Sequence, residues 1–168
     1  MMIKIFLDII LTINCTYYVS KLTPNYTNEN INVCKRLLKN NKYDLTSELI
    51  IAVAWKETRL TYAKKPNPWN CVGPLQIKYK YWCPNKKGHW SVIKADGRLK
   101  NCDTFQAGLK ALNYYSKKYK NLDHMLCAYG PATCTKRKND PSYKPKLPSK
   151  QPYVRSVKKY IRKLKTND

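Results

Sequence analysis

Apolar residues recur every three or four positions in several parts of the chain, and this spacing places them on one face of an α-helix. The segments that show it are 31–38, 105–115, 122–129 and 153–164. The pattern predicts a mainly α-helical protein with little β-strand. A length of 168 residues predicts one domain.

The most apolar of these segments is Leu49–Trp55, seven consecutive apolar residues. A surface helix would alternate apolar and polar faces, so this segment is predicted to be a core helix. Asp44 stands where an N-cap is expected, and Glu48 would lie in the first turn, where a negative charge favours the helix dipole. The helix must end before Pro66.

Proline and glycine punctuate residues 61–104, which are predicted to be loops. The segment Ser142–Pro152 is rich in proline and lysine and is expected to be extended. The chain then closes with a predicted basic helix, Tyr153–Leu164. Its Val154 and Val157 share one face and its lysines the other.

The N-terminus has the pattern of a secretory signal. A short basic start precedes the apolar stretch Ile5–Ile13, which only Asp8 interrupts. We expect residues 1–20 to be a signal peptide, cleaved near Cys15 or Ser20. The apolar stretch is short for a bilayer span. An ordinary apolar N-terminal helix or strand is the alternative.

Seven cysteines support export to an oxidising compartment. Signal removal would take Cys15 and leave six in a domain that covers residues 21–168. The six disulfide candidates are Cys34, Cys71, Cys83, Cys102, Cys127 and Cys134. Six cysteines allow 15 connectivities. Short loops favour Cys83–Cys102 and Cys127–Cys134. No C-x2-C pair is present, so a zinc site is not predicted. No other metal and no cofactor is predicted either.

Charge is the largest compositional anomaly, with 33 Lys and Arg against 10 Asp and Glu, a formal net charge of +23. Residues 136–168 carry 12 of the bases and 2 of the acids. Such a charge favours a polyanionic partner. Export separates the chain from cytosolic nucleic acid, so we expect no specific nucleic acid, and an anionic membrane or the anionic polymers of a cell wall remain as partners of the basic C-terminal segment.

Two non-enzymatic interpretations remain open. Lysines and aromatic residues interleave in Lys78–Trp82, which could stack sugars or bases in a wall-glycan or nucleic-acid binding module. The last helix could instead act directly on membranes, although its apolar face is short and suited to packing on the core.

Glu57 is the carboxylate with the most unusual setting. On a helical wheel it lies about 20° from Ile50 and about 40° from Val53, within an apolar sector. Apolar surroundings favour the neutral carboxyl and should raise the pKa of Glu57, as a general acid requires. The alternative is a surface carboxylate at the helix end that pairs with Arg59 or Lys64.

Several short motifs follow Glu57 in a characteristic order. They are Glu-Thr at 57–58, Gly-x-Leu-Gln-Ile from Gly73, Phe-x-Ala-Gly-x-x-x-Leu from Phe105, Ala-Tyr at 128–129 and Tyr-Val-x-x-Val from Tyr153. Together they resemble the soluble lytic transglycosylase domain, which is similar in fold to goose-type lysozyme. The resemblance covers about residues 32–163. It implies a single lysozyme-like helical domain, stapled by disulfides.

The resemblance also implies the site. Glu57 falls on the family's catalytic glutamate. The expected substrate-binding residues are Thr58, Gly73, Leu75, Gln76, Tyr129 and Tyr153. Two departures concern substrate contacts: Gly130–Ala132 replaces asparagine-alanine-glycine, and Ser149 stands where the family has an acid.

The implied reaction cleaves the bond between N-acetylmuramic acid and N-acetylglucosamine in peptidoglycan, with Glu57 as acid and then base, to leave 1,6-anhydro-muropeptides. Hydrolysis of the same bond, as in goose-type enzymes, is the alternative. A two-carboxylate mechanism would need a partner, for which Asp96 and Asp103 are candidates. We expect the protein to be a monomer. We expect its location to be secreted, periplasmic, cell-wall-associated or virion-associated.

Overall fold

The computed structural model describes residues 2–63, 67–83, 98–99, 102–130 and 147–166. The helices in these ranges are α1 (Met2–Leu22), α2 (Asn28–Asn40), α3 (Ser47–Thr58), α4 (Tyr79–Trp82), α5 (Thr104–Lys118), α6 (Leu122–Tyr129), the 3-10 turn η1 (Pro148–Lys150) and α7 (Pro152–Lys165). The strands are β1 (Cys71–Val72), β2 (Ile77–Lys78), β3 (Arg98–Leu99) and β4 (Cys102–Asp103). The prediction of a mainly helical protein is confirmed.

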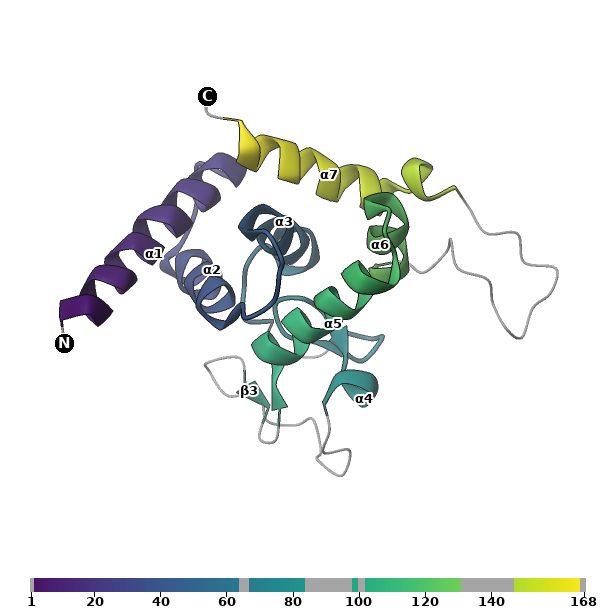
Figure 1. Ribbon diagram of the computed structural model, residues 1–168, viewed down its shortest axis with the longest axis horizontal. Coiled ribbons are helices and arrows are strands. Elements are labelled where there is room, and N and C mark those ends of the chain that lie inside the picture. Colours follow the sequence, from purple (N-terminus) through teal and green to yellow (C-terminus); the bar gives the residue numbers. More distant parts are fainter. Residues whose placement is uncertain (1, 64–66, 84–97, 100–101, 131–146, 167–168) are drawn as a thin grey trace.

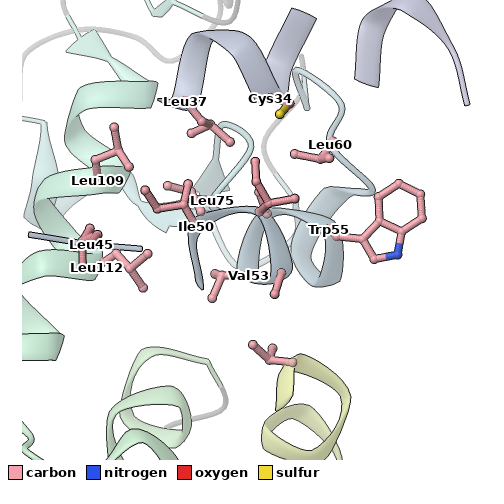
Figure 2. Packing of buried hydrophobic residues seen from close by; sticks show 14 of the residues in the cluster. Cys34, Leu37, Leu45, Ile50, Val53, Trp55, Leu60, Leu75, Leu109 and Leu112 are labelled. Atoms are coloured by element: carbon pink, nitrogen blue, oxygen red, sulfur yellow. The ribbon is translucent and has the colours of Figure 1, made fainter. Parts of the chain in front are cut away.

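Helix α3 lies at the centre of the molecule, with α1, α2, α5, α6 and α7 around it (Figure 1). Its residues Ile50–Trp55 are all buried, as the run of apolar residues predicts. Figure 2 shows Leu37 of α2 and Leu109 of α5 packed toward this helix from different sides. A helix surrounded in this way can hold a side chain at its end in a fixed position.

The helix ends differ slightly from the predicted ones. The N-cap of α3 is Thr46, whose hydroxyl accepts a hydrogen bond from the backbone N–H of Leu49, and not Asp44. Glu48 lies in the first turn as expected. Helix α2 starts at Asn28, before the first apolar residue, because Thr27 and Asn30 cap it reciprocally.

Helix α1 is part of the packed structure. Cys15 forms a disulfide with Cys34 of α2, and both Cys15 and Val19 are fully buried. The helix contacts α2 and α7. At 21 residues it is longer than the apolar stretch alone indicates, and Ile5–Leu22 is long and apolar enough to cross a membrane. The expectation that the segment is too short is therefore corrected.

The other cysteines follow the predicted pairing in part. Cys83 and Cys102 form a disulfide, as the short loop favours. Cys127 is also disulfide-bonded, and its expected partner Cys134 lies outside the described residues. Cys71 carries a free thiol, because Cys34 bonds to Cys15. Disulfides and an apolar N-terminal helix are compatible with export.

A small hairpin follows α3 and forms one side of the site. Strands β1 and β2 pair antiparallel, with Val72 opposite Ile77. Gly73 has a φ of 74°, and a Cβ at this position would lie 2.6 Å from the Cβ of Thr104 in α5. Only glycine fits this turn, which brings the hairpin against α5.

Candidate active site

Glu57 lies in the last turn of α3 and lines a cleft of about 600 Å³. The hairpin, α4, α5, α6 and α7 supply the other walls. Their lining residues are Asn67, Trp69, Cys71, Gln76, Ile77, Lys78, Tyr81, Trp82, Ala111, Tyr115, Ala128, Tyr129, Gly130 and Tyr153. Among the described residues, Glu57 is the only carboxylate of this cleft.

The carboxyl group of Glu57 accepts a hydrogen bond from Tyr153. The hydroxyl of Tyr153 lies 2.6 Å from Oε1 of Glu57. Burial raises the pKa of Glu57 above its ordinary value of 4.5, although the Tyr153 hydrogen bond and the charge of Lys56 lower it. The neutral acid therefore persists to a higher pH than in an exposed glutamate. This agrees with the setting that the helical wheel predicts.

Tyr153 can approach Glu57 because the residue beside it is a glycine. A Cβ on Gly130 would lie 2.7 Å from the ring of Tyr153, closer than real contacts allow. Burial and the charge of Glu57 raise the pKa of Tyr153 well above 10.0. Its hydroxyl thus keeps its proton and remains a donor to the carboxyl group. Gly130 is the first residue of the stretch Gly130–Ala132, which differs from the motif that the sequence resembles, and a side chain at this position would meet the ring of Tyr153.

Tyr129 forms a second fixed wall. Its hydroxyl donates to the carbonyl oxygen of Leu75 at 2.6 Å, so this hydroxyl ties α6 to the hairpin. The pKa of Tyr129 is raised well above 10.0, chiefly by burial. Its ring meets Tyr115 edge to face, with centroids 5.7 Å apart. Such contacts make a rigid aromatic surface on this side of the cleft.

Gln76 lines the cleft from the end of the hairpin turn. Its amide nitrogen donates to the carbonyl oxygen of Gly73 at 2.9 Å, and its amide oxygen accepts from Asn67 at 2.9 Å. The backbone of Gln76 has a φ of 46°, a conformation that non-glycine residues rarely adopt. These two hydrogen bonds hold the side chain in one orientation beside the cleft.

The structure brings together four of the seven predicted site residues. Glu57, Gln76, Tyr129 and Tyr153 line the cleft. Thr58 instead donates to the carbonyl oxygen of Pro74 at 3.0 Å, which fastens the hairpin turn to the end of α3. Leu75 is fully buried in the core, and Gly73 faces Thr104. These three residues support the cleft from behind and do not line it.

Aromatic residues of the predicted loop region also line the cleft. Trp69 is 76% exposed and Tyr81 is 65% exposed, and Trp82 lies in the same wall. In the sequence, the alternating lysines and aromatic residues of Lys78–Trp82 point to this wall, although Tyr79 is buried in the core. Nothing in the sequence marks Asn67 or Trp69, which stand among prolines.

Of the two candidate second carboxylates, the structure describes only Asp103. Asp103 caps α5 by accepting from the backbone N–H groups of Phe105 and Gln106, and it pairs with Arg36. It does not line the cleft. Asp96 lies outside the described residues, as do residues 131 and 132.

A second hollow of about 490 Å³ lies next to the cleft, and Trp82 lines both. Trp82 meets Tyr114 edge to face at 5.6 Å. Three lysines line this hollow, namely Lys110, Lys117 and Lys118. The aromatic wall of the cleft therefore continues onto a basic surface of α5.

No family model, curated protein or solved structure matches the chain.

Proposed function

We propose that the protein is a peptidoglycan lytic transglycosylase in which Glu57 acts first as general acid and then as general base. One observation carries the proposal: a carboxyl group whose pKa is raised by burial, hydrogen-bonded to Tyr153, is the only acid in the described part of an aromatic cleft. The motifs that resemble the lytic transglycosylase domain supply the choice of peptidoglycan.

In the first step, neutral Glu57 gives its proton to the glycosidic oxygen and the bond from that oxygen to C1 of the muramoyl sugar breaks. The substrate's own N-acetyl group supports the positive charge at C1. Tyr153 then donates to the carboxylate that forms and stabilises it. A second protein carboxylate is not required.

In the second step, the Glu57 carboxylate takes the proton of the muramoyl 6-hydroxyl, and this oxygen forms a new bond to C1. The product is a 1,6-anhydro sugar, and Glu57 is protonated again. Raised pKa values suit an acid that must donate near neutral pH. Gln76 and the wall of Trp82, Tyr115 and Tyr129 would orient the sugars.

Digestion of purified peptidoglycan tests this proposal. Mass spectrometry should find anhydro-muropeptides, whereas products heavier by one water would show goose-type hydrolysis and refute the transglycosylase. The Glu57→Gln variant should lose activity by about 10²–10⁴-fold, because an amide cannot donate the proton. Glu48→Gln is the matched control, since Glu48 lies in the first turn of the same helix, away from the cleft.

A further inference from the structure

Helix α1 has two halves that differ on their outward side. Large apolar side chains are exposed in the first half, at Ile3, Ile5, Phe6, Leu7, Ile9, Ile10 and Ile13. From Asn14 on, the exposed residues are polar or amphipathic: Asn14, Tyr17 and Ser20. Figure 1 shows the N-terminal end of α1 projecting away from the other helices.

The exposed apolar residues cover a wide arc of the helix. At 100° per residue, the positions from Ile3 to Ile13 spread over about 200° of the helical wheel. A helix that packs on a protein partner needs an apolar stripe of only about 100°. A wider arc without polar residues is what a lipid environment accommodates, because lipid surrounds a helix instead of touching one side.

The opposite side of the same segment faces the rest of the domain. Asp8 pairs with Lys39 of α2 at 3.4 Å, so the one acid of the segment faces the domain and not the apolar arc. Two residues past the arc, Cys15 is buried and bonded to Cys34. In its first half, helix α1 therefore has one side exposed and apolar and the other side facing the domain, and its second half packs on the protein.

The disulfide decides between a span and a surface attachment. A span over Ile5–Leu22 would place Cys15 about 10 Å inside the hydrocarbon, at 1.5 Å per residue from Leu22. Cys34 could not then bond to it without drawing the domain into the membrane. The arc from Ile3 to Ile13 is about 15 Å long, half of the roughly 30 Å of a hydrocarbon core.

We infer that α1 remains with the mature protein through the Cys15–Cys34 disulfide and inserts its apolar arc, Ile3–Ile13, into one leaflet of a lipid bilayer. The protein is then attached to a membrane surface without spanning it. Insertion would be deepest at the N-terminal end, and Asn14 and Tyr17 would lie at the level of the headgroups.

Charge favours anionic headgroups as neighbours of the inserted arc. The end of α7 contacts α1 just past the arc, where Tyr17 and Lys21 both donate to the carbonyl oxygen of Thr166. Lys163 and Lys165 are exposed beside this contact. Cations near an anionic membrane surface add binding free energy that salt removes, whereas apolar insertion persists at high salt.

Vesicle co-sedimentation of the full oxidised chain tests the insertion. The protein should sediment with phosphatidylcholine vesicles in high salt, and more tightly with phosphatidylcholine–phosphatidylglycerol vesicles in low salt. The variant Ile5→Ser/Phe6→Ser/Ile9→Ser should lose at least tenfold in high-salt binding. Leu122→Ser/Leu147→Ser, which changes exposed leucines elsewhere, is the matched control and should bind like the wild type.

Failure of the wild type to bind in high salt, or wild-type binding by the triple variant, would overturn the insertion. Mass spectrometry of the secreted protein under non-reducing conditions tests retention. A mature chain that lacks Cys15, both as continuous polypeptide and as a disulfide-linked peptide, would overturn the inference. Neither readout depends on catalytic activity, so the inference and the proposed function fail separately.

Discussion

Burial of the Glu57 carboxyl group sets the expected pH dependence of the reaction. The acid must be protonated to act, and its pKa lies above the ordinary 4.5 because burial disfavours the charged form. We therefore expect kcat/KM to fall as pH rises through this raised pKa, with the basic limb of the profile above pH 4.5. A basic limb of the kcat/KM profile at or below pH 4.5, measured with soluble glycan fragments as substrate, would contradict this prediction.

The same pKa shift predicts an effect of Glu57 on stability. A carboxyl group whose pKa is raised on folding stabilises the native state below its unfolded pKa, and this contribution is lost as pH rises through the folded pKa. Glu57→Gln should therefore melt at a higher temperature than the wild type at neutral pH, and the difference should vanish in acid. Calorimetry at both pH values measures this, and an equal difference at both would refute it.

Gly130 controls the position of Tyr153. In Gly130→Ala the added Cβ would lie 2.7 Å from the Tyr153 ring, so the ring must move and its hydrogen bond to Glu57 must lengthen. We expect activity to fall about tenfold or more, since small misplacements of catalytic groups cost up to about 10²-fold. Tyr153→Phe should show a similar loss with the ring left in place. Full activity in both variants would remove Tyr153 from the mechanism.

Spacing along one helix singled out Glu57 as a candidate, and the family resemblance then selected it; the spacing gave no sign of its partner. The wheel position of Glu57 depends only on residues 50–57, all in one helix. Tyr153 lies 96 residues away, and its hydroxyl reaches Glu57 only because α7 packs along α3. Local pattern carries no information on such a distance, so Tyr153 and Gln76 entered the predicted site through a family resemblance alone. Neither the local spacing nor the family resemblance pointed to Asn67 or Trp69.

At the scale of elements, the Cys83–Cys102 disulfide joins the end of α4, whose Tyr81 and Trp82 line the cleft, to β4 at the start of α5. The two cysteines are 19 residues apart. A cross-link over a loop of this size stabilises by about 3 kcal/mol, through reduced entropy of the unfolded chain. Cys83→Ser/Cys102→Ser should lower the free energy of unfolding in urea by about that amount. Cys71→Ser is the control, since this thiol is free, and an equal loss there would contradict the assignment.

The helices were predictable where one face or the whole segment is apolar. The bounds of α6 are those that the spacing predicts, and residues Ile50–Trp55 of the apolar run in α3 are all buried. Helix α1 was interpreted as a signal because a basic start and an apolar stretch have the same pattern in a leader and in a packed helix. The structure is compatible with a signal peptide, and it adds the burial of Cys15 and Val19 and the bond of Cys15 to Cys34, which the local pattern could not predict.

At the scale of the whole molecule, the charge of +23 should, under the proposed function, attract the protein to anionic cell walls. The outer side of α7 exposes Arg155, Lys159, Arg162, Lys163 and Lys165. We expect the rate of lysis of intact cell walls to fall several-fold between about 0.1 M and 1 M salt, where the screening length shrinks from about 10 to about 3 Å. Substitution of these five residues by glutamine should flatten the salt dependence. An unchanged dependence would exclude α7 as the localising surface.

The hydrogen bond between Glu57 and Tyr153 also has a consequence for biosynthesis. A ribosome completes Glu57 and the hairpin early, yet the donor arrives only with the last helix, 96 residues later. Every nascent or prematurely terminated chain that stops before Pro152 would hold an unsupported glutamate and an open side of the cleft. Under the proposed function, the cell that makes this protein carries no wall-cleaving fragments during translation. Cleavage would begin only when the C-terminus has been delivered and α7 has docked.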